Sequence, residues 1–320
     1  MKAPSDWLEP DRDQLEIFID ADFRHAGNKG FVSVRSFYEG EGTNAFRITP
    51  VSLVGGLKFL MEVAEDDARR AANEPQPVVF CPPIAVFTDD KYAREQDIAL
   101  GLAISVECDS HAQEARAKLE QTLGPATLVV RSGGQWTDAN TGEVGDKLHV
   151  HYRLKTPAQG REALAKLKYA RILATNLVGG DASNKPICHP IRWAGSWHKK
   201  AAPRLCEIES VLADNEVDLD EVLQRLNGAW PPPGGWEQYA PGAKPTPRSK
   251  DQGGEQEPLD WSNSFGKIIT GKEFHPVLVP LAASFAARGI PEPAGGTSCT
   301  RCSPTPRRPI RSGCDAATSS

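Results

Sequence analysis

Two carboxylates separated by one residue, Glu107 and Asp109 in the segment SVECDS, end an apolar run. Because side chains at positions i and i+2 of a strand point to the same face, both carboxylates can converge on one cation. Carboxylate oxygens are ligands that suit Mg²⁺ or Mn²⁺. Acidic residues are also common at solvated strand ends, so the spacing alone leaves a metal half-site and an exposed strand end as alternatives.

A second group of chemistry-bearing residues lies in RSGG, residues 131–134, and in HVHYR, where His149, His151 and Arg153 alternate onto one face. A glycine turn after a strand exposes backbone N–H groups to an anion, and His and Arg side chains donate to phosphate oxygens. The pattern favours phosphate recognition, although two half-exposed histidines on an edge strand would give the same pattern. Zinc is less favoured, since no further Cys or His stands at ligand spacing nearby.

The third group is the segment VGGDASNKPICHPIRWAGSWHKK. Asp181 in it could complete a metal-binding carboxylate triad, and Trp193 could stack on a base. Its cations could contact phosphate, and they are Arg192, His198, Lys199 and Lys200. A basic surface loop is the alternative. A structural zinc is a weaker possibility, because its three potential ligands have irregular spacing: Cys188, His189 and Cys206.

The elements that must position these residues alternate along the chain. Helices are predicted over 51–72, 110–124 and 160–180, the second capped by Ser110 and ended by Gly124. The insert from Gln135 to Asp146 is predicted to be hairpin-like. Strands are predicted in GFVSVRSFYE from Gly30, PVVFCPP, DIALGLAISVECD, PATLVVRSGG, KLHVHYRLKTP and PRLCEIESVL. This alternation indicates an α/β or α+β fold with mixed strand pairing.

Composition places further limits on the protein. A length of 320 residues predicts about two domains, and 39% hydrophobic residues is enough for a sizeable core. The net charge of −5 argues against a histone-like binder but leaves room for a local basic groove. We expect a cytoplasmic protein with reduced cysteines, because no apolar run spans a bilayer, the N-terminus lacks signal-peptide features and the seven cysteines are scattered.

The order of the three motifs resembles the primase-polymerase domain of the archaeo-eukaryotic primase superfamily, in the form found in phage and plasmid replication proteins. That family is marked by an acidic pair ending a strand, a Ser/Gly turn with a strand-borne His, and a later Asp followed by R-x-x-G-[ST]. The corresponding segments here are VECD, RSGG with KLHVHYR, and GGD with IRWAGSWHKK. The resemblance spans roughly residues 30–212.

The resemblance implies an α+β fold with an RRM-like primase-polymerase core, in which a mixed or antiparallel sheet is flanked by helices. It implies a nucleotidyltransferase that copies a DNA template with two divalent cations, Mg²⁺ or Mn²⁺, bound by Glu107, Asp109 and Asp181. The nucleotide would be bound by Ser132, Gly133, Gly134, Arg192, Lys199 and either His149 or His151, which share a face. The implied partners are single-stranded DNA, (d)NTPs and a helicase, as a further module or a separate protein.

The resemblance and the composition together divide the chain into five parts. A lead-in, residues 1–29, precedes the catalytic domain, residues 30–228. A Pro/Gly-rich linker, 229–258, leads to a small helical element, 259–293, and then to a tail, 294–320, that is disordered or altered. No GxxxxGK[ST] motif occurs, so we expect no ATPase within the 320 residues.

Two features depart from the family pattern. Glu107 stands where the family usually has Asp, which moves the carboxylate by about 1.5 Å. The insert 135–146 separates the Ser/Gly turn from the His strand more than in compact relatives. The first departure supports a second hypothesis, a catalytically weak or inactive replication-initiator or DNA-binding module. A metal-dependent nuclease using the same acids is a third.

Overall fold

The computed structural model describes residues 7–39, 45–180, 182–200, 202–229 and 235–239. These ranges fall within one compact unit, Met1–Thr246. The expected helical element and tail lie outside the described residues, as does most of the expected linker.

Five α-helices and ten strands make up the described part of the chain. The helices are α1 (Arg12–Phe23), α2 (Gly56–Asn73), α3 (Ala112–Leu123), α4 (Gly160–Leu177) and α5 (Leu219–Ala229). The strands are β1 (Phe31–Tyr38), β2 (Ala45–Ser52), β3 (Val78–Phe80), β4 (Ala85–Phe87), β5 (Ile98–Cys108), β6 (Leu128–Thr137), β7 (Val144–Gln159), β8 (Trp197–His198), β9 (Arg204–Leu205) and β10 (Glu207–Val211). None of the described helices is both long and apolar enough to cross a membrane.

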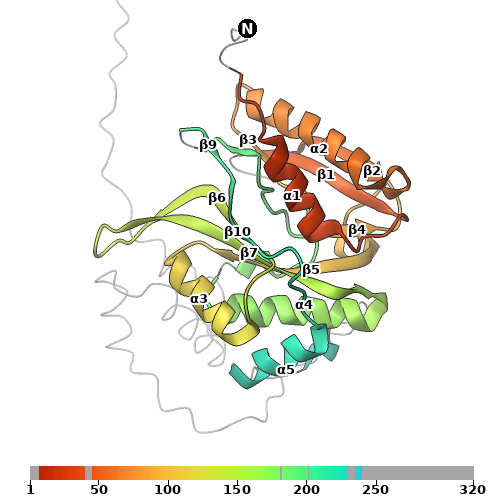
Figure 1. Cartoon of the computed structure of the whole chain (residues 1–320), viewed down its shortest axis with the longest axis vertical. Helices are drawn as coiled ribbons and strands as arrows, with labels where there is room; N and C mark the ends of the chain where they lie inside the picture. The colour runs from red at the N-terminus through yellow and green to blue at the C-terminus, as the bar shows by residue number, and fades with distance from the viewer. Residues whose placement is uncertain (1–6, 40–44, 181, 201, 230–234, 240–320) are drawn as a thin grey trace, which may run out of the picture. The chain divides into compact units, whose positions relative to one another are not determined.

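Eight strands form one sheet in the order β10-β6-β7-β5-β4-β1-β2, with β3 also paired to β1 (Figure 1). Each of these strand pairs is antiparallel in the described part of the chain. Strands β8 and β9 form a separate two-stranded sheet. The expected α+β class with an antiparallel sheet flanked by helices is therefore confirmed.

The helices divide between two hydrophobic cores. One core joins α3, α4 and α5 to side chains such as Ile104 and Val150 of the central strands. The other joins α1 and α2 to side chains such as Val32 and Val130. Figure 1 shows α1 and α2 gathered near β1 and β2, and α3, α4 and α5 gathered near β5 and β7. The sheet is thus covered by helices from two groups.

The sheet opens between β5 and β1, and this opening positions the candidate site. Strand β4 pairs with β5 only as far as Gly101. Farther along β5, the side-chain amide of Asn184 donates to the Ser105 carbonyl at 3.2 Å. On the opposite side, Arg35 of β1 donates to the Cys188 carbonyl at 2.5 Å. The segment 182–195 therefore lies between the two strands and carries its side chains to the end of β5.

Several elements differ from their sequence-based predictions. Helix α1 falls in the expected lead-in, yet Leu15 and Phe18 are fully buried in the core. Its apolar residues have helical spacing, and Asp11 caps it by accepting from the Gln14 N–H. Strand β2 and helix α5 were not predicted, and α2 begins at Gly56 instead of residue 51 because β2 occupies residues up to 52.

The predicted cap of α3 at Ser110 is also wrong. The N-cap is His111, whose backbone is left-handed at φ 44° and whose side chain makes no capping hydrogen bond. The predicted end at Gly124 is confirmed, because this residue takes φ 92° directly after the helix.

A buried carboxyl group in α1 makes stability depend on pH. Asp22 is fully buried, and burial raises its pKa to about 8 although the charge of Arg153 lowers it. In the unfolded chain the same group ionises near its ordinary value of 3.8. Between about pH 4 and pH 8 the folded state holds a proton that the unfolded state has lost, so the free energy of unfolding falls as pH rises.

Replacing Asp22 with Asn should remove this pH dependence, because the amide does not ionise. Measured by urea unfolding, the stability of Asp22→Asn relative to wild type should rise between pH 5 and pH 8 by up to about 1.4 kcal/mol per pH unit. The matched control is Asp20→Asn on the same helix, whose carboxylate is exposed. A constant difference between Asp22→Asn and wild type over this range would contradict the prediction.

Candidate functional site

The antiparallel register of β5 and β7 places Glu107 directly opposite His149. The two side chains share one face of the sheet, and Nε2 of His149 lies 3.7 Å from Oε1 of Glu107. The opening in the sheet brings a second imidazole to the same oxygen, because Nε2 of His189 lies 3.5 Å from it. One carboxylate oxygen at the end of β5 is therefore flanked by two histidines from different parts of the chain.

The surroundings keep Glu107 ionised and His149 neutral. Burial alone would raise the pKa of Glu107, but the His189 hydrogen bond and the nearby charges of His149, His189 and Arg192 lower it to about 2. Burial lowers the pKa of His149, an effect that the Glu107 charge only partly offsets. The end of β5 thus carries a carboxylate that stays anionic across the physiological range, beside an imidazole that adds little charge.

Asp109 stands just beyond β5, and its side chain is 41% exposed. Its Oδ1 lies 3.0 Å from Nζ of Lys147 of strand β7. The third predicted metal ligand, Asp181, lies outside the described residues. The preceding residue, Gly180, packs against the backbone of Glu107, where an added Cβ would lie 2.9 Å from the Glu107 carbonyl oxygen.

The RSGG segment is a bulge within strand β6 and not a turn after it. Strand β6 continues to Thr137, and its pairing with β7 shifts register between Arg131 and Gln135. The expected hairpin-like insert is the outer part of this β6–β7 hairpin. Ser132 is fully buried, and its hydroxyl has no hydrogen-bond partner among the described residues.

Gly133 allows the β8–β9 pair to pack closely on this bulge. It has φ +76°, and a Cβ added here would lie 2.6 Å from Cβ of His198 and 3.3 Å from the carbonyl oxygen of Arg204. Gly134 instead faces Lys147, since a Cβ added at Gly134 would lie 3.0 Å from the Lys147 side chain. The glycines therefore bring His198 and Lys147 together over β6.

A cluster of cations surrounds His198, and we call it the His198 cluster. Its other members are Lys147, Arg192, Lys200 and Arg204. Burial and then the charges of these four side chains lower the pKa of His198 to about 4. Because the charge of Arg192 also lowers the pKa of Glu107, the cluster adjoins the end of β5. Carboxylates partly compensate this charge, since Lys147 lies 3.0 Å from Asp109, Arg192 lies 3.5 Å from Glu39 and Arg204 lies 2.7 Å from Asp146. The cluster can bind an anion next to a bound cation where the anion takes the place of such a carboxylate.

His149 and His151 share a face as expected, but only His149 belongs to the site. His151 is fully buried, with Nδ1 3.0 Å from the Ser105 hydroxyl and 3.6 Å from Asp22 Oδ2. The Phe18 ring packs edge-on against it. Contact of either histidine with a nucleotide stays a prediction, and the structure shows that His151 is fully buried while His149 is 3% exposed beside Glu107.

Two more residues considered for ligand binding are structural. Arg153 is fully buried and donates to Glu216 and to the carbonyl oxygens of Ala21 and Ala213. Trp193 is fully buried, and its Nε1 donates to the Pro82 carbonyl. Three aromatic rings surround Trp193, those of Phe18, Phe23 and Phe80. A base cannot stack on Trp193.

Arg192 and Lys199 point to different surroundings. Arg192 lies near the Glu107 site, with Nη2 3.5 Å from Glu39 Oε1. Lys199 donates to the carbonyl oxygen of Glu74, which follows helix α2. The structure therefore groups Arg192 with the end of β5 and places Lys199 toward α2.

The donor chemistry fits a hard divalent cation at Glu107 and Asp109, since both offer carboxylate oxygens at one strand end. No group of three or more His, Cys, Asp or Glu residues that could hold a metal ion occurs among the described residues, which do not include Asp181. A structural zinc was also considered at Cys188, His189 and Cys206. These residues do not form a metal-binding group within the described ranges either.

Sequence reasoning did not assign a role at this site to three of its members. Lys147 and Arg204 meet the site through strand pairing and through the bulge at Gly133, which no local pattern reveals. His189 was considered only for zinc, and its contact with Glu107 depends on the opening in the sheet. An Arg and a Lys near a glycine in a strand indicate a shared site only when the bulge at that glycine is already known.

The close approach at Gly133 predicts a graded loss of stability. Gly133→Ala should lower the free energy of unfolding by about 1–2 kcal/mol for the left-handed backbone and by a further 1–3 kcal/mol or so for the contact with His198. Gly142→Ala is a matched control, because Gly142 has φ +75° with nothing within 4 Å. Urea unfolding of both variants measures the difference, and equal losses would show that β8 does not press on β6.

Comparisons with known proteins found similarity at the level of structure. No family model and no curated protein matches the sequence. The AEP domain of the cyanophage S-2L primase-polymerase matches at probability 1.00 with a TM-score of 0.45 and 16% identity, over 68% of this chain and 100% of that chain. The catalytic domain of primase RepB′ in complex with initiator DNA matches with a TM-score of 0.43 and 11% identity, over 68% of this chain and 95% of that chain.

A further structure of primase RepB′ matches with a TM-score of 0.43 and 10% identity, over 67% of this chain and 62% of that chain. These solved structures are of a primase-polymerase and of a primase.

Proposed function

We propose that the chain is a template-dependent DNA primase-polymerase, a nucleotidyltransferase that transfers nucleotides from (d)NTPs in the replication of a phage or plasmid. The proposal is carried by one observation: ionised Glu107 adjoins the His198 cluster. The charge of Arg192 lowers the pKa of both Glu107 and His198. Phosphoryl transfer needs in-line positioning and charge neutralisation more than covalent chemistry by the protein. A carboxylate site for cations beside a cationic site for phosphates supplies both.

Glu107, Asp109 and Asp181 would hold the divalent cations, Mg²⁺ or Mn²⁺. When bound, such ions activate the attacking 3′-hydroxyl and neutralise the leaving pyrophosphate. Glu107 is suited to this role because its pKa of about 2 leaves it ionised. The sequence position of Asp181, directly after Gly180, supports its inclusion, since Gly180 packs on the backbone of Glu107.

His149 would orient the nucleotide without opposing the cations. Burial lowers its pKa, so the ring is neutral at pH 7 and does not repel a neighbouring divalent ion. A neutral imidazole still offers one N–H donor to a phosphate oxygen. Its position opposite Glu107 would keep that phosphate close to the carboxylates.

The His198 cluster would receive the triphosphate. Arg192 presents a guanidinium next to the Glu107 site, and Lys147 approaches both Asp109 and the glycine bulge. Arginine and lysine bind phosphate oxygens through charge-assisted hydrogen bonds. In this arrangement the α-phosphate would lie toward Glu107 and the β- and γ-phosphates toward His198, over single-stranded DNA as template.

One specific observation favours the second candidate, a weakly active or inactive replication-initiator module that binds DNA. Both carboxylates have partners within the chain, Glu107 with two histidines and Asp109 with Lys147. A protein that had lost metal binding could retain such contacts. The two functions differ in metal-dependent synthesis, which the next experiment measures.

Removing the carboxylate of Asp109 should abolish synthesis. We expect wild-type protein to incorporate labelled nucleotides on a single-stranded template with Mn²⁺ or Mg²⁺, and Asp109→Ala to lose at least about a hundredfold in rate because a metal ligand is missing. Asp20→Asn, on the exposed face of α1, is the control. Lanes with and without a primer separate extension from priming.

Each outcome assigns a function. Metal-dependent extension by wild type and not by Asp109→Ala supports the polymerase. DNA binding without product favours the initiator module, and shortening of the labelled strand favours a nuclease. Equal extension by both proteins would contradict the assignment of Asp109.

Triphosphate binding should also raise the pKa of His198. Four cations now add to burial in lowering that pKa to about 4, and an anion among them would cancel part of their field. We expect the His198 ring resonances in an NMR titration to report a pKa at least about one unit higher with dNTP than without, compared with a His198→Gln spectrum for assignment. An unchanged pKa at saturating dNTP would place the triphosphate elsewhere.

A further inference from the structure

A cavity of about 560 Å³ lies between helix α2, strand β2 and the segment that precedes α1, and Glu107 does not line it. Two aromatic side chains and three arginines contribute to its lining: Trp7, Phe46, Arg47, Arg69 and Arg70. We call it the Trp7 pocket. Aromatic rings and guanidinium groups together offer flat surfaces, which suit planar ligands.

Trp7 lines this pocket, and the residue that follows it is tied to helix α2. The side chain of Asn73 accepts from the Leu8 N–H at 3.0 Å and donates to the Leu8 carbonyl at 3.0 Å. Trp7 nevertheless remains 51% exposed. The two hydrogen bonds hold the backbone of Leu8 on helix α2, and the half-exposed indole beside it is open to a stacking ligand.

The arginines of the pocket are also held in place, and their charges are mostly compensated. Arg70 donates to Asp66 at 2.8 Å, and Arg69 donates to Glu9 at 2.7 Å. Arg47 lies 2.5 Å from the buried Asp67. With each charge paired, the pocket has no large excess of positive charge for a phosphate. What it offers is stacking surface, which suits a nucleobase.

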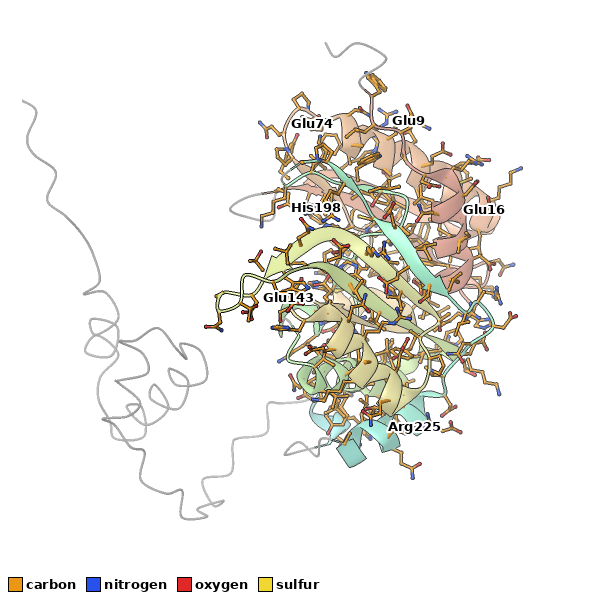
Figure 2. The ribbon with its side chains drawn as sticks, turned by 60° about the vertical axis from the view of Figure 1, so that its left-hand side comes forward. Glu9, Glu16, Glu74, Glu143, His198 and Arg225 are labelled. Carbon is orange, nitrogen blue, oxygen red and sulfur yellow. The ribbon has the colours of Figure 1, made fainter. Side chains whose placement is uncertain are left out.

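The pocket is connected to the His198 cluster by the chain itself. Glu74 lines the pocket, and its carbonyl oxygen accepts from Lys199, the residue after His198. Figure 2 shows Glu74 and His198 on the same side of the unit, with Glu74 nearer the N-terminal end. The backbone of a strand with one base in the Trp7 pocket could therefore reach Lys199 and the His198 cluster.

We propose that the Trp7 pocket binds a base of single-stranded nucleic acid whose phosphates pass the His198 cluster. This inference deepens the proposed function, on which it rests, since the strand bound there would be the template. The geometry assigns stacking to Trp7 and Arg70, and phosphate contact to Lys199 and Lys200.

The test measures binding without catalysis. A fluorescein-labelled 20-nucleotide single strand is titrated with protein in EDTA, and anisotropy gives the Kd. Loss of one stacking partner weakens single-strand binding by roughly tenfold, so we expect that loss for Trp7→Ala and for Arg70→Ala. Trp7→Phe should keep most of the affinity, because a ring remains. Trp236→Ala is the matched control, as Trp236 packs over Lys166 beside α4 and should bind like wild type.

A second readout locates the base directly. A strand carrying 5-iodouracil is irradiated with wild-type protein, and the cross-linked peptide is identified by mass spectrometry. We expect a peptide that contains Trp7 or Phe46. Cross-links found only in other peptides, or affinities of Trp7→Ala and Arg70→Ala equal to wild type, would overturn the inference.

The outcomes separate this inference from the proposed function. Loss of binding in the pocket variants, with no incorporation by wild type, would keep the pocket and remove the polymerase. Incorporation by wild type with unchanged binding in the pocket variants would do the reverse. If wild type binds no single strand, the inference is overturned together with a template-dependent polymerase. Thermal unfolding of each variant excludes loss of fold as the cause of a change.

Discussion

The pairing of β5 with β7 is the interaction on which the rest of the site depends. It places Glu107 opposite His149 and, two residues earlier, Ser105 opposite His151. Since side chains alternate along a strand, a slip of one residue would send both histidines to the other face, among Ile104 and Val106. The apolar packing on that second face against α3 and α4 therefore fixes the polar register on the first.

The segment 182–195 provides hydrogen-bond partners at the end of β5 that β4 does not reach. Strand β4 is short, so the far end of β5 would present unpaired backbone groups toward β1. Asn184 satisfies one of them at Ser105, and Arg35 ties the same segment to β1 through Cys188. Side-chain contacts of this segment therefore take the place of a strand between β5 and β1. The same arrangement brings His189 to Glu107.

Much of the fold could be predicted from local patterns, and much of the site could not. The alternation in β1 and β7 and the apolar run of β5 predicted strands that the structure confirms. Period-two spacing predicted that His149 and His151 share a face, but the pairing of β5 with β7 that places His149 opposite Glu107 depended on the tertiary register. Helix α1 was missed although its spacing is helical, because its first residues are strongly charged.

Other parts of the site were beyond any local signal. Trp193 stands among cations in sequence but among Phe18, Phe23 and Phe80 in space, since its segment enters the core between two elements. The bulge at Gly133 decides which cations meet, and a glycine pair in sequence is equally compatible with a turn.

The ion pair between Asp109 and Lys147 has a consequence for how ligands would bind together. A divalent ion at Asp109 would compete with the Lys147 ammonium for this carboxylate, and a displaced ammonium would face the glycine bulge and the other cations without its counter-charge. That displaced charge favours an anion at the same moment that the cation arrives. Cation and anion binding would thus be positively linked, each strengthening the other by the same factor. Lys147 would thus couple the binding of the cation to the binding of the anion.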